Sequence, residues 1–278
     1  MSPEQLIADR LAEALAQTGT RPLVVGICGA QGSGKSTMAA ALARRFPRTA
    51  TLSLDDLYLT RAERAALAQN EHPLFRTRGA PGTHDVALGI ETIDALRAGN
   101  AVRLPRFDKA RDDRALSATW PEASASCDLV IFEGWCVGAI PQPEEALAAP
   151  VNDLERADDP DGRWRRAVNA ALAGSYQTLF ARLDMLILLA APDWETVGRW
   201  RQEQEDGLRQ AGDGAGVMDE AAVARFIQHF ERLTRHILEE MPDRAGMVLR
   251  LSADRHAVQS TPATPQNGLP AHHLSTTL

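Results

Sequence analysis

The chain has 278 residues, a net charge of -7 and a pI of about 5.5. This acidic balance argues against nucleic acid or an anionic membrane as the main partner, although a local basic pocket could still bind an anion. The N-terminal segment lacks the basic start and apolar run of a signal peptide, and the longest apolar run is too short to span a bilayer. We therefore expect a cytoplasmic globular protein, large enough to bury a substantial core.

Apolar segments with the pattern of buried strands alternate with helical segments along the chain. A helix is expected over residues 2–18, buried strands are expected at PLVVGICG and CDLVIFEGW, and further strands are expected at TATLSL, DMLILLA and GMVLRLS. The segments between the strands have helical periodicity or, at HPLFRTRGAPGTHD, the glycines and prolines of a loop. Strands that alternate with helices predict an α/β fold, with a mainly parallel sheet flanked by helices on both faces.

We expect a single domain over residues 1–251, with the N-terminal helix inside residues 1–19. Residues 252–278 are polar and rich in Thr, Pro, Gln and Ser, and therefore predict a flexible tail. The three cysteines, Cys28, Cys127 and Cys136, include no CxxC pair, and two of them lie in apolar runs. Buried, reduced thiols are therefore expected, which suits a reducing cytosol.

The stretch GAQGSGKST has the spacing of a phosphate-binding loop, and it follows a predicted strand and precedes a predicted helix. Its glycines allow backbone N–H groups to turn toward phosphate oxygens, and the helix N-terminus adds positive potential. Lys35 should reach the β- and γ-phosphates, and Ser36 should bind Mg²⁺. The motif predicts the three-layer P-loop NTPase fold, with ATP and Mg²⁺ as ligands. The predicted nucleotide-binding residues are Gly29, Ala30, Gln31, Gly32, Ser33, Gly34, Lys35, Ser36 and Thr37.

Acidic residues follow two of the predicted strands. Asp55 and Asp56 come at the end of TATLSL, where strand alternation would place their side chains on opposite sides, so that only one need face the γ-phosphate. That carboxylate could accept the proton of an attacking hydroxyl, or the pair could only cap the following helix. Glu133 ends CDLVIFEGW, where an acid could orient Mg²⁺ or could be structural.

Two loops, RTRGAPGTHD and RFDKARDDR, carry many cations for an acidic protein. They predict a bound anion, because an arginine fork fits a carboxylate with two hydrogen bonds. Arg78 or Arg106 could supply that fork, and Asp85 and His84 could bond to hydroxyls of the acceptor. A solvated, charged loop is the alternative. The residues expected to bind the acceptor are Arg78, His84, Asp85, Arg106 and Lys109.

A helix is predicted after the fourth strand, and VGRWRQEQE near its start carries Arg199 and Arg201. Residues two apart point about 200° apart around a helix, so only one of these arginines could face a γ-phosphate at a time. Exposed surface arginines are the alternative. A later helix presents four basic residues on one face, which either looks toward the site or is solvated and paired with neighbouring glutamates: Arg225, His229, Arg232 and His236.

The order of these blocks resembles known kinases. LSLDDLY resembles the stretch after the second strand in the uridine kinase, phosphoribulokinase and pantothenate kinase group of P-loop kinases, whose catalytic base is matched here by Asp55. Further blocks, from LFRTRGAPGTHDV through FEGWCVG to RWRQEQE, resemble the D-glycerate 3-kinase family of plants and fungi over roughly residues 20–251. This resemblance implies a metal-orienting role for Glu133 and a helical lid whose arginines neutralise the transferring charge.

We therefore expect an ATP-dependent kinase that phosphorylates a hydroxyl of a small hydroxy acid, and the resemblance implies D-glycerate as acceptor and 3-phosphoglycerate as product. Another small-molecule kinase, for a nucleoside such as uridine or for pantothenate, and a P-loop ATPase without an acceptor are the alternatives. The aromatic content of 5% favours an acid over a nucleoside, because a base needs rings on which to stack. The sequence leaves the oligomeric state open.

Overall fold

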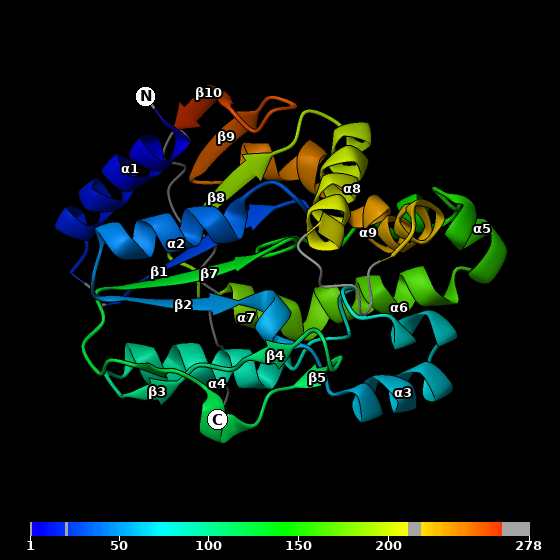
Figure 1. Ribbon diagram of the computed structural model, residues 1–278, viewed down its shortest axis with the longest axis horizontal. Helices are drawn as coiled ribbons and strands as arrows, with labels where there is room; N and C mark the ends of the chain where they lie inside the picture. The colour runs from blue at the N-terminus through cyan, green and yellow to red at the C-terminus, as the bar shows by residue number, and fades with distance from the viewer. Residues whose placement is uncertain (1, 20–21, 211–217, 263–278) are drawn as a thin grey trace, which may run out of the picture.

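A central sheet runs through the computed structural model, which describes residues 2–19, 22–210 and 218–262 (Figure 1). In this part of the chain the sheet has six strands in the order β10-β9-β8-β1-β7-β2, and neighbouring strands are parallel except that β10 is antiparallel to β9. The fold prediction is confirmed. The strands are β1 Leu23–Gly29, β2 Thr49–Ser53, β7 Leu129–Gly134, β8 Met185–Ala190, β9 Met247–Leu251 and β10 Ala257–Pro262.

Helices cover both faces of this sheet, because successive side chains of the inner strands are apolar and point to opposite faces. Val24 belongs to one hydrophobic cluster and Val25 to the other. The Val25 cluster includes α1 Pro3–Gln17, α2 Lys35–Arg45 and α8 Trp194–Gln210. The Val24 cluster includes α4 Val86–Arg97, α7 Gln177–Phe180 and α9 Glu220–Glu240.

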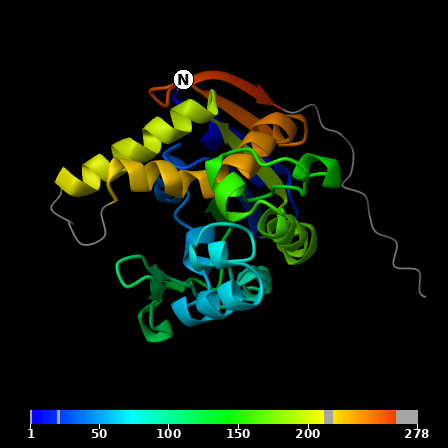
Figure 2. The same cartoon turned by 90° about the vertical axis from the view of Figure 1, so that its right-hand side faces the viewer.

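Some of the shorter elements lie at the carboxyl edge of the sheet, which faces the viewer in Figure 2, with α8 and α9 on one side and α3 on the other. The remaining helices are α3 Arg61–Asn70, α5 Asp153–Asp158 and α6 Arg163–Ala171, with one π turn, η5 Leu172–Tyr176. The short 3-10 helices are η1 Leu54–Leu57, η2 Pro73–Arg76, η3 Ser117–Thr119, η4 Glu144–Leu147 and η6 Met241–Asp243. Two small antiparallel pairs are β3 Val102–Arg103 with β6 Glu122–Ala123, and β4 Phe107–Asp108 with β5 Asp113–Arg114.

Two details differ from the predicted elements. β2 ends at Ser53, whose hydroxyl accepts a 3.3 Å hydrogen bond from the Asp55 N–H and starts η1, so the predicted strand alternation at Asp55 and Asp56 is wrong. Residues 257–262 lie in the predicted tail but form β10, because their backbone pairs with the open edge of β9. The prediction for residues 263–278 lies outside the described residues.

The three cysteines are buried, as predicted. Among the described residues, no helix is both long enough and apolar enough to cross a lipid bilayer.

Candidate active site

The phosphate-binding loop joins β1 to α2 at the carboxyl edge of the sheet. Gly32 and Gly34 have φ angles of +76° and +84°, which glycine adopts without strain. A Cβ atom at Gly32 would come within 2.5 Å of the Trp200 Cβ and 3.1 Å of the Trp200 backbone, so only glycine lets this turn pack against α8. Gly34 is the N-cap of α2, and Lys35 is its first residue. The loop therefore has the strand–loop–helix context that phosphate binding requires.

Ser36 and Glu133 meet beside this loop. The Ser36 hydroxyl donates a 2.9 Å hydrogen bond to Oε1 of Glu133. Glu133 is only 4% exposed, and its Oε2 has no hydrogen-bond partner among the described residues. A buried carboxylate oxygen in this state is costly unless a ligand or water satisfies it. Mg²⁺ binds through one or two protein oxygens together with phosphates and water, so this hydroxyl–carboxylate pair fits the ion.

Asp55 lies just beyond β2, with 34% of its side chain exposed. Tyr58 Oη donates a 2.7 Å hydrogen bond to its Oδ1, and Lys109 Nζ donates one of 2.7 Å to its Oδ2. Burial opposes ionisation of this carboxyl group, but the positive charges of Lys109 and Lys35 outweigh burial and hold the pKa of Asp55 well below its usual range. Asp55 is therefore an ionised carboxylate under the influence of the phosphate-loop lysine.

Asp56 has different partners. Its Oδ1 accepts a 3.0 Å hydrogen bond from the Phe107 N–H, and its Oδ2 lies 3.3 Å from Nη1 of Arg106. Burial raises the pKa of Asp56. The N-cap of α3 is Thr60, so neither aspartate caps that helix. Asp56 instead ties η1 to β4, and the two adjacent carboxylates have separate surroundings.

Arg78 and Asp85, like Arg106 and Lys109, form ion pairs with neighbouring side chains. Arg78 forms an ion pair with Asp112. Asp85 is the N-cap of α4, where its Oδ1 accepts a 3.0 Å hydrogen bond from the Leu88 N–H, and its Oδ2 lies 2.9 Å from Nη2 of Arg114. Any acceptor that used these side chains would have to compete with the partners they already have.

His84 is buried between Tyr58 and Tyr176. Its Nδ1 lies 2.5 Å from Tyr176 Oη, which also accepts a 3.0 Å hydrogen bond from the Gly82 N–H. The His84 ring stacks on Tyr58 with 4.7 Å between centroids. Burial lowers the pKa of His84 to about 3, so the imidazole is neutral near pH 7. Its Nε2 is buried and has no hydrogen-bond partner among the described residues.

The two arginines of α8 also differ. The Arg199 side chain is exposed, and its Nη2 donates a 3.1 Å hydrogen bond to Thr196 Oγ1. Arg201 forms an ion pair with the buried Glu205, and its guanidinium lies 5.5 Å from the centre of the Phe226 ring on α9. Arg199 is therefore free to approach a nucleotide, whereas Arg201 joins α8 to α9.

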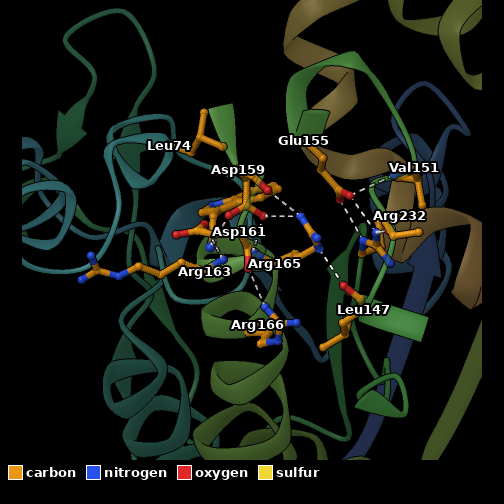
Figure 3. Close-up of polar contacts among 12 residues, drawn as sticks. Leu74, Leu147, Val151, Glu155, Asp159, Asp161, Arg163, Arg165, Arg166 and Arg232 are labelled. Carbon is orange, nitrogen blue, oxygen red and sulfur yellow. Dashed lines mark hydrogen bonds and ion pairs between the residues drawn. The ribbon is translucent and has the colours of Figure 1, made fainter. Parts of the chain in front are cut away.

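The chain that follows β7 is fixed by two buried ion pairs (Figure 3). Arg165 pairs with Asp159 at 3.0 Å and donates a 2.7 Å hydrogen bond to the Leu147 carbonyl. Arg232 pairs with Glu155 at 2.7 Å, and both of these carboxylates are fully buried. Arg232 matches neither alternative predicted for the basic face of α9. Its guanidinium is bound to a buried glutamate of α5, so it is neither directed at the site nor solvated.

Some contacts of the site were not predicted. The hydrogen bond from Tyr58 to Asp55 is one of them. The two residues are three apart, a spacing at which side chains on a helical turn can meet, so this contact could have been predicted. Arg255 donates a 2.6 Å hydrogen bond to the carbonyl of Gly32, and it lies over the Trp200 ring with 5.1 Å to its centre. No local signal links Arg255 to the phosphate loop, since the contact joins residues more than 200 positions apart.

The fold, the phosphate loop and the adjacent carboxylates define a P-loop kinase that acts on a small molecule. Residues 24–139 match the model of the Phosphoribulokinase / Uridine kinase family. The chain is 34% identical to the chloroplastic D-glycerate 3-kinase of Arabidopsis thaliana over 239 residues, which cover 80% of the chain and 50% of that protein. It therefore spans only half the length of that relative.

Two further relatives match over most of their length. The chain is 35% identical to the uncharacterized kinase mug58 of Schizosaccharomyces pombe over 252 residues, which cover 83% of the chain and 87% of that protein. The structure of D-glycerate 3-kinase from Cryptococcus neoformans var. grubii superposes with a TM-score of 0.78 at 26% identity, over 93% of the chain and 98% of that structure. The chain belongs to the D-glycerate 3-kinase family, within the phosphoribulokinase and uridine kinase group, and the resemblance is confirmed.

Proposed function

We propose that the protein transfers the γ-phosphate of ATP to the primary hydroxyl of D-glycerate, giving 3-phosphoglycerate and ADP. The observation that carries this proposal is the position of Asp55, an ionised carboxylate beyond the end of β2 that is influenced by Lys35 and paired with the exposed Lys109. A base beside the phosphate loop suits a hydroxyl nucleophile, and an exposed cation beside the base suits an anionic acceptor. D-glycerate is the substrate in the names of two of the relatives.

The nucleotide half of the site has a simple division of roles. The N–H groups of residues 29–37 bind the phosphates of ATP, and Lys35 neutralises charge on the β- and γ-phosphates. Ser36 and Glu133 hold Mg²⁺, which screens the phosphate charge when it is bound. Arg199 stabilises charge on the transferring phosphoryl group. It suits this role better than Arg201 because its side chain is exposed, whereas that of Arg201 is paired with Glu205.

The acceptor half uses the cations that are easiest to release. Arg106 and Lys109 are 36% and 60% exposed, and either can meet the carboxylate of the acid. Arg106 and Arg78 are both paired, with Asp56 and Asp112, and Arg106 suits this role better because its side chain is 36% exposed and that of Arg78 is 30% exposed. The Nε2 of His84 is available for a hydroxyl oxygen, whereas Asp85 has both oxygens engaged and shapes the loop. A reducing compartment such as the cytosol suits the buried thiols.

A substrate panel tests this proposal. The purified protein is given ATP, Mg²⁺ and one of D-glycerate, L-glycerate, glycerol, pantothenate, uridine or ribulose 5-phosphate, and ADP formation is measured. We expect D-glycerate to react fastest and glycerol, which lacks the carboxylate, to react poorly. Fast phosphorylation of uridine or pantothenate with D-glycerate inert would overturn the choice of acceptor. Equal ATP hydrolysis with and without every acceptor would indicate a P-loop ATPase instead.

A further inference from the structure

Both oxygens of the proposed base are engaged before any acceptor arrives. Oδ1 of Asp55 accepts from Tyr58 and Oδ2 accepts from Lys109, each at 2.7 Å. A carboxylate that is ion-paired with an ammonium group holds its negative charge more firmly and is a weaker base, because taking up a proton breaks a favourable interaction. In this arrangement Asp55 is poorly suited to remove a proton from a hydroxyl or from water.

Only one of these two partners can leave easily. Tyr58 is 5% exposed, and its ring contacts His84 at 4.7 Å and Phe107 at 5.2 Å between centroids. Lys109 is on the loop between β4 and β5, with 60% of its side chain exposed, and a lysine has a flexible four-carbon stem. Lys109 can therefore release Asp55 while the fold stays intact, whereas Tyr58 cannot.

The charge of Lys109 determines what can draw it away. Because Lys109 is 60% exposed, opening its ion pair with Asp55 costs little, and a second anion that competes for the ammonium group shifts the balance toward the open state. Of the neighbouring acids, Asp56 is already bonded to the Phe107 N–H and Arg106. A carboxylate on the acceptor would supply the new partner, whereas water or a neutral alcohol would leave the ion pair in place.

We infer that Lys109 is a latch on the general base: its ammonium group masks Asp55 until the carboxylate of an acidic acceptor binds the lysine and frees Oδ2. The hydroxyl proton then passes to Oδ2 as the new O–P bond forms, and the bond between the γ-phosphorus and the bridging oxygen breaks with its electron pair going to ADP. This inference rests on the proposed function for its acceptor. It explains how an acidic acceptor can have a higher kcat than a neutral one. It also explains how ATP hydrolysis by water can be suppressed.

Hydrolysis of ATP without any acceptor provides the test. We compare the full-length wild type with Lys109→Met, Asp55→Asn, the double variant, and Arg111→Met as a matched control, since Arg111 is an exposed cation two residues further along the same loop. Lys109→Met should raise the hydrolysis rate about tenfold, a fraction of the roughly 10²- to 10⁴-fold that a general base supplies. The gain should disappear in the double variant, and Lys109→Arg should raise the rate less than Lys109→Met.

Turnover with acceptors gives the second readout. In Lys109→Met the kcat for glycerol should rise, because Asp55 is no longer masked, and the KM for D-glycerate should rise, because its carboxylate loses the cation that binds it, so the difference in kcat between the two acceptors should narrow. An unchanged or lower hydrolysis rate in Lys109→Met would overturn the inference. So would a gain that persists without Asp55, or an equal gain in Arg111→Met. Because hydrolysis needs no acceptor, these outcomes remain decisive even if the wild type fails to phosphorylate D-glycerate, a result that would refute only the proposed function.

Discussion

The nucleotide half and the acceptor half of the site differ in how their charges are satisfied. In the nucleotide half, Lys35 forms no ion pair among the described residues, and one oxygen of Glu133 has no partner there. In the acceptor half, the cations are paired with acids of the same region. These pairs are Arg78 with Asp112, Arg114 with Asp85, Arg106 with Asp56 and Lys109 with Asp55.

This difference separates two ways of building a binding site. Phosphates of ATP meet a loop whose N–H groups and lysine are ready for them, so binding adds interactions. An acceptor meets side chains that already neutralise one another, so binding exchanges one partner for another. A count of cations in a loop therefore does not give the number of unpaired cations, because each of these four has an acidic partner.

Lys35→Ala should break the nucleotide half and produce the largest effect. Turnover should become undetectable, because the phosphates lose their positive side chain, while the melting temperature of the free protein should stay the same, because Lys35 has no partner in the described fold. Coupled-enzyme kinetics and thermal denaturation measure the two. Unchanged turnover in this variant would refute the role of the phosphate loop.

Asp55→Asn and Asp56→Asn distinguish two adjacent acids with different surroundings. Asp55→Asn should lower kcat by about 10²- to 10⁴-fold with little change in the KM for ATP, because only general-base help is lost. Asp56→Asn should lower kcat less, since Asp56 anchors the Phe107 N–H of β4. Steady-state kinetics of both variants decide the matter, and an inactive Asp56 variant beside an active Asp55 variant would reverse the assignment.

Arg199→Ala and Arg201→Ala test the same contrast within one helix. Arg199→Ala should lower kcat by about 10²- to 10³-fold, the usual cost of removing one donor to developing charge, with a smaller change in the KM for ATP. Arg201→Ala should mainly reduce the free energy of unfolding, by about 3 kcal/mol, since it leaves the buried Glu205 without its cation. Kinetics and urea denaturation separate the two effects. A change only in the KM would place Arg199 in ground-state binding.

His84→Gln tests how the free energy of unfolding depends on pH in the acceptor half. Of these variants it should have the smallest effect on activity at pH 7. The pKa of His84 is about 3 in the folded protein and about 6.5 when unfolded, so below pH 6.5 the unfolded chain binds a proton that the folded one does not. The wild type should lose up to about 1.4 kcal/mol of stability per pH unit from this residue as the pH falls toward 3, and His84→Gln should lose less. Urea denaturation at pH 7 and 4.5 measures this, with the exposed His256→Gln as control.

Much of the fold follows from local patterns. The apolar runs predicted β1 and β7, because a strand buried on both faces needs continuous apolar residues, and the other three parallel strands were also predicted. The phosphate loop was predicted residue by residue, because its chemistry depends on backbone N–H groups of one contiguous segment. The end of β2 was misplaced by one residue, since Ser53 bonds to the Asp55 N–H and starts a 3-10 turn.

The sequence by itself thus determined the class of fold and the phosphate-binding loop, since each depends on neighbours along the chain. Only the tertiary structure decided which charged groups are paired. Lys109 reaches Asp55 across 54 residues, and Arg255 reaches Gly32 across 223. The edge of β9 likewise recruits β10 from a segment with the composition of a tail. These contacts depend on backbone pairing and on charges brought together by folding, which residue type and spacing do not specify.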